Sequence, residues 1–204
     1  APEQPQIYLT SPPDFELSSF SEALGGVLDA MQIACVRLAL ASHDEGEISR
    51  AADTLREVCH QRDVALVIDN HILLAERHGL DGVHLTDAAR PVRKARKQLG
   101  NDAIVGAFCG TSRPDRMTAG EAGADYVSFG PVGASALSDG DQADFEIFEW
   151  WSQMIEVPVV AEGGLTQALV SQLGPVTDFF GIGTEIWKTE DPAAALKTLM
   201  SGLA

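Results

Sequence analysis

Residues 104–130 read IVGAFCGTSRPDRMTAGEAGADYVSFG, which is an apolar run, an amphipathic segment and a second apolar run in succession. Pro114 fits the first turn of a helix, and Gly123 lies where that helix would end. Both apolar runs are nearly continuous rather than alternating, which is typical of parallel strands covered on both faces. The stretch therefore predicts a strand, a helix and a second strand of one parallel sheet.

The same unit recurs along the whole chain. Short apolar runs predict eight strands, at Ile7–Leu9, Ile33–Leu38, Val64–Ile68, Gly82–Leu85, Ile104–Phe108, Tyr126–Phe129, Val157–Ala161 and Phe179–Ile182. Amphipathic segments between them predict helices at Ser18–Met31, Glu45–Arg62, Ile72–His78, Pro91–Leu99, Pro114–Ala122, Asp144–Ile155, Thr166–Leu173 and Pro192–Leu203. We expect a helix after each strand.

Eight such units in 204 residues predict an α/β fold, a single (β/α)8 TIM barrel that forms one domain over residues 1–204. The alternative is a doubly wound open sheet, which would want a glycine-rich loop after its first strand. The sequence there is Leu9-Thr10-Ser11-Pro12-Pro13, which is not such a loop. The barrel is therefore favoured.

The composition narrows the classes of partner. The chain has 30 Asp and Glu against 14 Lys and Arg, a formal net charge of -16. So acidic a surface repels nucleic acid and anionic lipid, and no apolar stretch approaches the ~20 residues of a membrane span. Cys35, Cys59 and Cys109 are odd in number and widely spaced, which favours a reducing cytoplasm and speaks against a zinc site. Assembly into a homo-oligomer is left open.

In a TIM barrel the active site lies at the C-terminal ends of the strands. Gly163, Gly164 and Gly183 follow the seventh and eighth strands, and Thr184 adds a hydroxyl. Backbone N–H groups in such turns can approach a phosphate at the start of a short helix. The alternative is that these glycines merely permit tight turns with positive φ.

Three motifs carry a resemblance. GADYVSFGPV at 123–132 lies between DGVHL at 81–85 and VPVVAEGG at 157–164. Together they resemble the thiamine phosphate synthase family and its relative, the thiazole tautomerase, and the likeness extends from about Ile7 to the C-terminal helix. It implies a transfer assisted by Mg²⁺, in which the nitrogen of thiazole phosphate displaces pyrophosphate from hydroxymethylpyrimidine diphosphate. Such a leaving group must be stabilised by cations.

The resemblance implies a role for individual residues. Arg37 would hold the pyrophosphate, and Asp69 and Asn70 stand where the family has an Asn-Asp pair that binds Mg²⁺, in reversed order. The second carboxylate ligand falls on Ala89, so Asp87 is the nearby substitute.

Both lysines of the family pattern are replaced, one by Ala39 and the other by Ser138. Ser135 keeps a hydroxyl in the same loop as Ser138 and would contact an anion or ring, acting with Arg37 as a catalytic residue. Thr111, after the fifth strand, is a further candidate for substrate binding.

The residues themselves leave alternatives open. Arg37 could instead form an ion pair with Asp69 inside the barrel mouth, and Asp69 and Asp87 could cap helices rather than bind metal. His84, inside a strand, is interpreted as a core histidine. Cys109 is interpreted as a packed residue rather than a nucleophile, because no histidine is placed beside it by the sequence.

We therefore expect a thiamine phosphate synthase-like enzyme that takes small phosphorylated substrates and turns over slowly, since two cations of the family pattern are missing. The alternative is a non-catalytic phosphate-ligand binder or regulator that keeps the glycine turns and has lost the means to stabilise the leaving group. Thiazole tautomerase activity is disfavoured, because the histidine that the tautomerase uses as acid and base falls on Gly110.

Overall fold

The computed structural model describes residues 4–87, 91–133 and 142–203. Its strands are β1 (Gln6–Thr10), β2 (Cys35–Leu38), β3 (Ala65–Asp69), β4 (Gly82–Leu85), β5 (Ile104–Gly110), β6 (Tyr126–Phe129), β7 (Val159–Glu162) and β8 (Phe179–Ile182). The α-helices are α1 (Leu17–Ala30), α2 (Glu45–His60), α3 (Ile72–Arg77), α4 (Val92–Leu99), α5 (Arg113–Glu121), α6 (Phe145–Met154), α7 (Gln167–Leu173), α8 (Thr184–Trp187) and α9 (Pro192–Met200). Two short 3-10 helices, η1 (Gly174–Val176) and η2 (Ser201–Leu203), complete the assignment.

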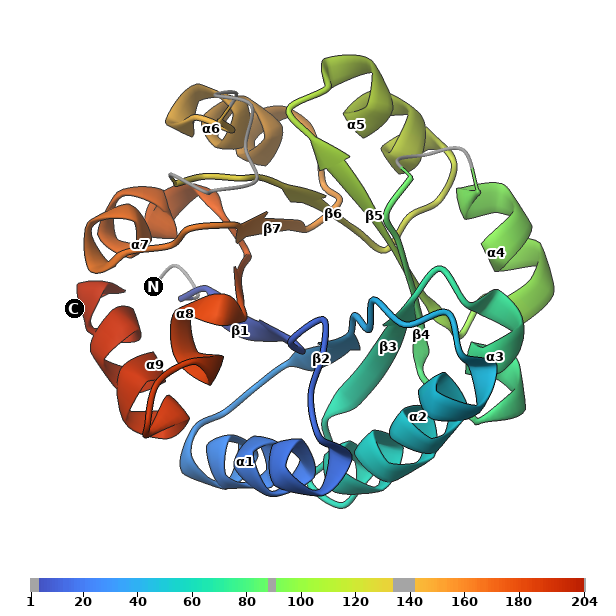
Figure 1. Cartoon of the computed structure of the whole chain (residues 1–204). Helices are drawn as coiled ribbons and strands as arrows, with labels where there is room; N and C mark the ends of the chain where they lie inside the picture. The colour runs from blue at the N-terminus through green and yellow to red at the C-terminus, as the bar shows by residue number, and fades with distance from the viewer. Residues whose placement is uncertain (1–3, 88–90, 134–141, 204) are drawn as a thin grey trace.

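The eight strands are all parallel and close into a barrel in sequence order, with β1 paired to both β2 and β8. Figure 1 shows the strands in the centre and the helices as a surrounding ring. The predicted (β/α)8 TIM barrel is confirmed. Because all strands run the same way, their C-terminal ends meet at one mouth of the barrel, and the candidate residues that the structure describes lie at or just after these strand ends.

Two apolar clusters hold the barrel together. Strand side chains that point outward, such as Leu9 and Val36, pack with the helices into one continuous buried core. Side chains that point inward form a second cluster, made of Tyr8, Cys35, Val67, Tyr126 and Val160. Gly106 leaves room for this inner cluster, since a Cβ atom there would lie 2.0 Å from the Tyr126 ring. Burial on both faces explains why the strands read as nearly continuous apolar runs.

Most helix starts and ends follow the signals in the sequence. Side-chain oxygens accept a first-turn N–H at the starts of α2, α5, α6, α7 and α9, from Asp44, Ser112, Asp144, Thr166 and Asp191 respectively. Gly123 has a positive φ angle of 95° at a helix end, as the sequence predicted, and Gly79 and Gly100, with φ angles of 66° and 91°, end helices in the same way. Pro91 directly precedes α4 rather than lying in its first turn.

Two differences from the predicted elements have physical causes. The strand predicted from Val157 begins at Val159, since Pro158 has no N–H to donate to a sheet, and the carbonyl of Val157 accepts the indole N–H of Trp151 (2.7 Å). Val157 is apolar because it packs against the core, although it is not part of the strand. The four-residue helix α8 was outside the eight predicted helices, because so short a segment shows no helical periodicity. Within the part of the chain that the structure describes, no helix has the length and apolar character needed to cross a bilayer.

Candidate active site at the barrel mouth

Arg37 occupies the inside of the mouth, near the end of β2. Its Nε donates to Oδ1 of Asp69 (2.5 Å) and its Nη2 to Oδ2 (3.1 Å), which is a bidentate pair with the neighbouring strand. Nη1 lies 3.5 Å from Oε2 of Glu162 at the end of β7. The Arg37 side chain is only 12% exposed. The ion pair with Asp69 is therefore present, and it holds the guanidinium at the place where an anion contact was predicted.

The charges of this group depend on one another. Burial opposes the charge of Arg37, but the carboxylates of Glu162 and Asp69 favour it and raise the pKa of Arg37 above its ordinary value. Burial raises the pKa of Glu162, and Arg37 opposes that rise. The Oε2 atom of Glu162 is buried and has no hydrogen-bond partner among the described residues. Glu162 was not among the predicted site residues, although a charged residue that ends a buried strand is a signal that can be read from sequence.

Asn70 connects the ends of β3 and β4. Its Oδ1 accepts the N–H of Thr86 (3.0 Å) and its Nδ2 donates to the Thr86 hydroxyl (2.7 Å). Asn70 has a φ angle of 59°, a left-handed conformation that Asn tolerates better than most residues. Its amide therefore fixes the loop that carries Asp87.

The predicted metal ligands are not gathered into a preformed cluster. Both oxygens of Asp69 bond Arg37, and the amide of Asn70 faces Thr86. Asp87 is exposed and makes no ion pair or hydrogen bond with the residues that the structure describes. Across residues 4–87, 91–133 and 142–203, no group of three or more His, Cys, Asp or Glu side chains is arranged to hold a metal. The magnesium site stays a prediction.

The glycine turn after β7 is built by close backbone contact with the loop after β6. The N–H of Gly133 donates to the carbonyl of Gly163 (2.8 Å), and a Cβ on Gly133 would lie 2.0 Å from the carbonyl oxygen of Gly164. Gly163 and Gly164 have φ angles of 89° and 76°. The positive φ that the tight-turn alternative expects is therefore present at Gly163 and Gly164 but not at Gly183, whose φ angle is -148°, and the phosphate interpretation stays a prediction.

The turn after β8 lies beside it. Gly183 precedes α8, and Thr184 begins that helix with an exposed side chain. The N–H of Gly183 donates to Oε1 of Glu185 (3.0 Å), and the N–H of Leu165 donates to Oε2 of the same carboxylate (3.1 Å). The two predicted phosphate turns are thus joined by a carboxylate. Glu185 was not predicted, because only the folded chain brings residues 165 and 183 together.

His84 and Cys109 fit their interpretation as packed residues. The Nδ1 of His84 lies 2.7 Å from the Tyr126 hydroxyl, which in turn lies 2.5 Å from that of Tyr8. Burial, with help from Arg37, lowers the pKa of His84, which favours the neutral ring. Burial, reinforced by Asp115, raises the pKa of the Cys109 thiol to about 12. A thiol with so high a pKa is a poor nucleophile.

Comparison with known proteins decides the family. The sequence model of the family described as thiamine monophosphate synthase matches residues 7–175. The chain belongs to this family. It is 42% identical over 196 residues to a thiamine-phosphate synthase of Rhodospirillum centenum, covering 94% of each chain. It is 38% identical to a thiamine-phosphate synthase of Erythrobacter litoralis, covering 93% of this chain and 91% of the relative.

A solved structure supports the fold of this family member. Thiamine phosphate pyrophosphorylase from Pyrococcus furiosus superposes with a TM-score of 0.80 at 21% identity. The superposition covers 98% of this chain and 97% of the other. At that identity the likeness shows the barrel alone.

The other positions that the family resemblance singled out lie after β5 or outside the described residues. Thr111 is exposed directly after β5. Ser135, Ser138 and Ala89 fall outside the described residues. Gly110 ends β5 with a φ angle of 54°.

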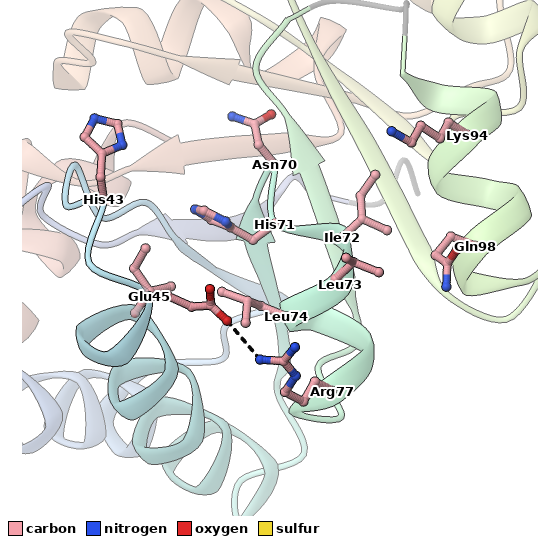
Figure 2. Close-up of a pocket in the computed structure, with 11 residues that line it drawn as sticks. His43, Glu45, Asn70, His71, Ile72, Leu73, Leu74, Arg77, Lys94 and Gln98 are labelled. Carbon is pink, nitrogen blue, oxygen red and sulfur yellow. Dashed lines mark hydrogen bonds and ion pairs between the residues drawn. The ribbon is translucent and has the colours of Figure 1, made fainter.

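A groove of about 530 Å³ opens beside the mouth of this family member. Figure 2 shows His43, Asn70 and His71 on one side and Lys94 of α4 across from them. Arg77, lower in the groove, is paired with Glu45 (2.9 Å). The groove therefore continues from Asn70 into a region with nitrogen-bearing side chains.

Proposed function

We propose that this protein is a thiamine-phosphate synthase, which joins hydroxymethylpyrimidine diphosphate and thiazole phosphate and releases pyrophosphate. The observation that carries this proposal is the likeness to thiamine-phosphate synthases along nearly the whole chain. The comparisons do not favour the two alternatives, a non-catalytic phosphate-ligand binder and a thiazole tautomerase. Synthesis of thiamine phosphate from the two purified substrates tests the proposal.

In this reaction a bond forms between the thiazole nitrogen and the methylene carbon of the pyrimidine, while the bond from that carbon to the diphosphate oxygen breaks. Negative charge collects on the departing diphosphate. Arg37 is the group placed to stabilise it. A guanidinium has five N–H donors; Asp69 takes two and Nη1 lies beside Glu162, which leaves the second N–H of Nη2 and one N–H of Nη1 as the donors proposed for an anion. Asp69 acts as a positioning residue, because it fixes the plane of the guanidinium.

The two phosphorylated substrates need separate anion sites. We assign the diphosphate to the side of the mouth that holds Arg37 and Asn70, and Asn70 also lines the groove of Figure 2. We assign the thiazole phosphate to the turns of Gly163, Gly164 and Gly183, with the Thr184 hydroxyl as an additional donor. With the diphosphate and the thiazole phosphate on opposite sides of the mouth, the thiazole nitrogen and the methylene carbon of the pyrimidine would meet between them. Ser135 and Thr111 are proposed to contact the substrates from the loops after β6 and β5.

Mg²⁺ is proposed as the cofactor, brought in with the diphosphate rather than held by the protein in advance. Magnesium sites of this kind use one or two carboxylates together with substrate phosphates and retained waters. Asp87 is exposed and engages no described partner, so it fits such a role, and Asn70 and Asp69 lie at the neighbouring strand end. When bound, the ion would neutralise charge on the leaving diphosphate.

We infer that this protein forms thiamine phosphate more slowly than a family member that has a lysine at both position 39 and position 138. Ala39 and the position of Ser138 each lack a cation that would donate a charge-assisted hydrogen bond. The protein is proposed to work in the cytoplasm, which its three buried free cysteines support.

A further inference from the structure

Glu185 lies beside the proposed phosphate turns, and its carboxylate is bonded to both of them. It stands in the first turn of α8, next to Thr184. Its two oxygens accept hydrogen bonds from the N–H groups of Gly183 and Leu165, at 3.0 and 3.1 Å. Each oxygen therefore accepts one N–H, Oε1 from the turn after β8 and Oε2 from the turn after β7, so the carboxylate bridges the two turns as an oxyanion would.

A phosphate monoester would want the same donors. A carboxylate and a dianionic phosphate cannot share one small set of N–H groups, because their charges repel and the donors are limited. Glu162 adds to the negative charge nearby, and its electrostatic coupling to Glu185 is one reason why its pKa is raised. The carboxylate of Glu185 thus already occupies the N–H groups of the turns to which the thiazole phosphate is assigned.

We propose that Glu185 is an internal competitor for the thiazole phosphate, one that must leave the N–H groups of Gly183 and Leu165 before a phosphate monoester binds. This inference rests on the proposed function, since it concerns the phosphate site of that reaction. It makes Glu185 a specificity-determining residue, because it sets how strongly the empty site attracts a phosphate dianion. The carboxylate covers the site when no substrate is present.

Other contacts also hold the turn that follows β8. The indole N–H of Trp187 donates to the carbonyl of Thr10 (2.7 Å), which ties α8 to the end of β1. The N–H of Ile186 donates to the carbonyl of Gly183 (3.0 Å). These contacts fix the backbone of the turn, so movement of one side chain is enough to expose the donors.

The test compares Glu185→Ala and Glu185→Gln with the unmodified protein, using inorganic phosphate as the probe in calorimetry. Glu190→Gln is the matched control, because it removes one charge from an exposed residue that follows α8 without touching the turns. We expect Glu185→Ala to bind phosphate at least about tenfold more tightly, in line with the strength of a hydrogen bond to a charged group. Glu185→Gln should fall between, since its amide still accepts one N–H, and Glu190→Gln should match the parent.

Amide NMR gives a second readout in the unmodified protein. Phosphate titration should shift the Leu165 and Gly183 N–H resonances, and in Glu185→Ala they should shift at lower phosphate concentration. Equal or weaker phosphate affinity in both folded Glu185 variants would overturn the inference, as would phosphate binding that leaves these two resonances in place. Thiamine phosphate formation is measured in parallel. A protein without turnover whose Glu185→Ala variant still gains phosphate affinity would refute the proposed function and keep the inference.

Discussion

The guanidinium of Arg37 and the carboxylate of Asp69 form two nearly parallel hydrogen bonds between adjacent strands, of 2.5 and 3.1 Å, at the inner wall of the barrel mouth. The remaining nitrogen of the guanidinium, Nη1, lies on the side of Glu162, 3.5 Å from its Oε2. Of the two interpretations that the sequence left open, the ion pair is present in the structure, and the anion contact stays a prediction. The ion pair orients the group that is assigned to the diphosphate.

Loss of Asp69 should destabilise the fold as well as the site. In Asp69→Ala the buried Arg37 keeps its charge without its bidentate partner, so we expect the free energy of unfolding to fall by about 3 kcal/mol. Urea denaturation measures it. The control is Glu45→Gln, which breaks the exposed pair with Arg77 and should cost less than about 1 kcal/mol. Equal losses in the two variants would contradict the structural role of the Arg37–Asp69 pair.

Glu162 should give the protein a recognisable dependence of stability on pH. Its pKa is raised by burial from the ordinary value of 4.5. A carboxyl that holds its proton more tightly in the folded chain stabilises that chain below its unfolded pKa, and this contribution is lost as the pH rises through the folded pKa. Glu162→Gln cannot ionise, so its stability relative to the parent should increase from pH 4 toward neutral pH, as urea denaturation at a series of pH values would show.

The pKa of Glu16 is shifted in the opposite direction to that of Glu162, so its effect on stability should change with pH in the opposite sense. Hydrogen bonds from Ser19 and Ser18 lower its pKa to about 2. Its contribution is therefore present above the unfolded pKa and lost as the pH falls through the folded value. Glu16→Gln should lose stability at neutral pH and match the parent in acid. If both variants showed the same trend with pH, the opposite environments assigned to the two carboxyls would be incorrect.

The glycine turns should tolerate no side chain where the two loops meet. In Gly133→Ala the new Cβ would collide with the carbonyl of Gly164, so the β6 and β7 loops must separate and phosphate affinity should be lost. Gly26→Ala is the control, because nothing lies within 4 Å of a Cβ at that position in α1. There the change should raise the free energy of unfolding by about 0.5 to 1 kcal/mol. Calorimetry with phosphate and urea denaturation would detect both effects, and unchanged phosphate affinity in a folded Gly133→Ala would show that the phosphate binds elsewhere.

Restoring the two lysines should raise the rate. Ala39 follows β2, and its N–H is held by the Ser11 hydroxyl (2.8 Å), so a longer side chain can be added on a fixed backbone. Each charge-assisted bond to the leaving diphosphate is worth about 1.5 to 3 kcal/mol. We expect the double variant Ala39→Lys, Ser138→Lys to have a higher kcat. Ala41→Lys, which adds a cation at an exposed position nearby, should leave kcat unchanged. A double variant no faster than Ala41→Lys would remove the explanation for slow turnover.

The barrel could be predicted from sequence because the strands are buried on both faces and most helices carry start or end signals. Arg37 and Asp69 could be placed at the mouth, since strand ends fix that position. The bridge made by Glu185 could not, because residues 165 and 183 meet only in the folded chain. Nor could the connection from Asn70 to Thr86, for which no pattern in either loop gives a signal.

Thiamine phosphate and pyrophosphate, quantified together during steady-state turnover with both substrates and Mg²⁺, test the central claim most directly. The account predicts that the two products appear in equal amounts, that either substrate alone gives neither, and that Arg37→Ala lowers the rate by at least about tenfold. No thiamine phosphate at saturating substrates would contradict the proposed reaction. Formation at an undiminished rate in Arg37→Ala would contradict the role assigned to Arg37.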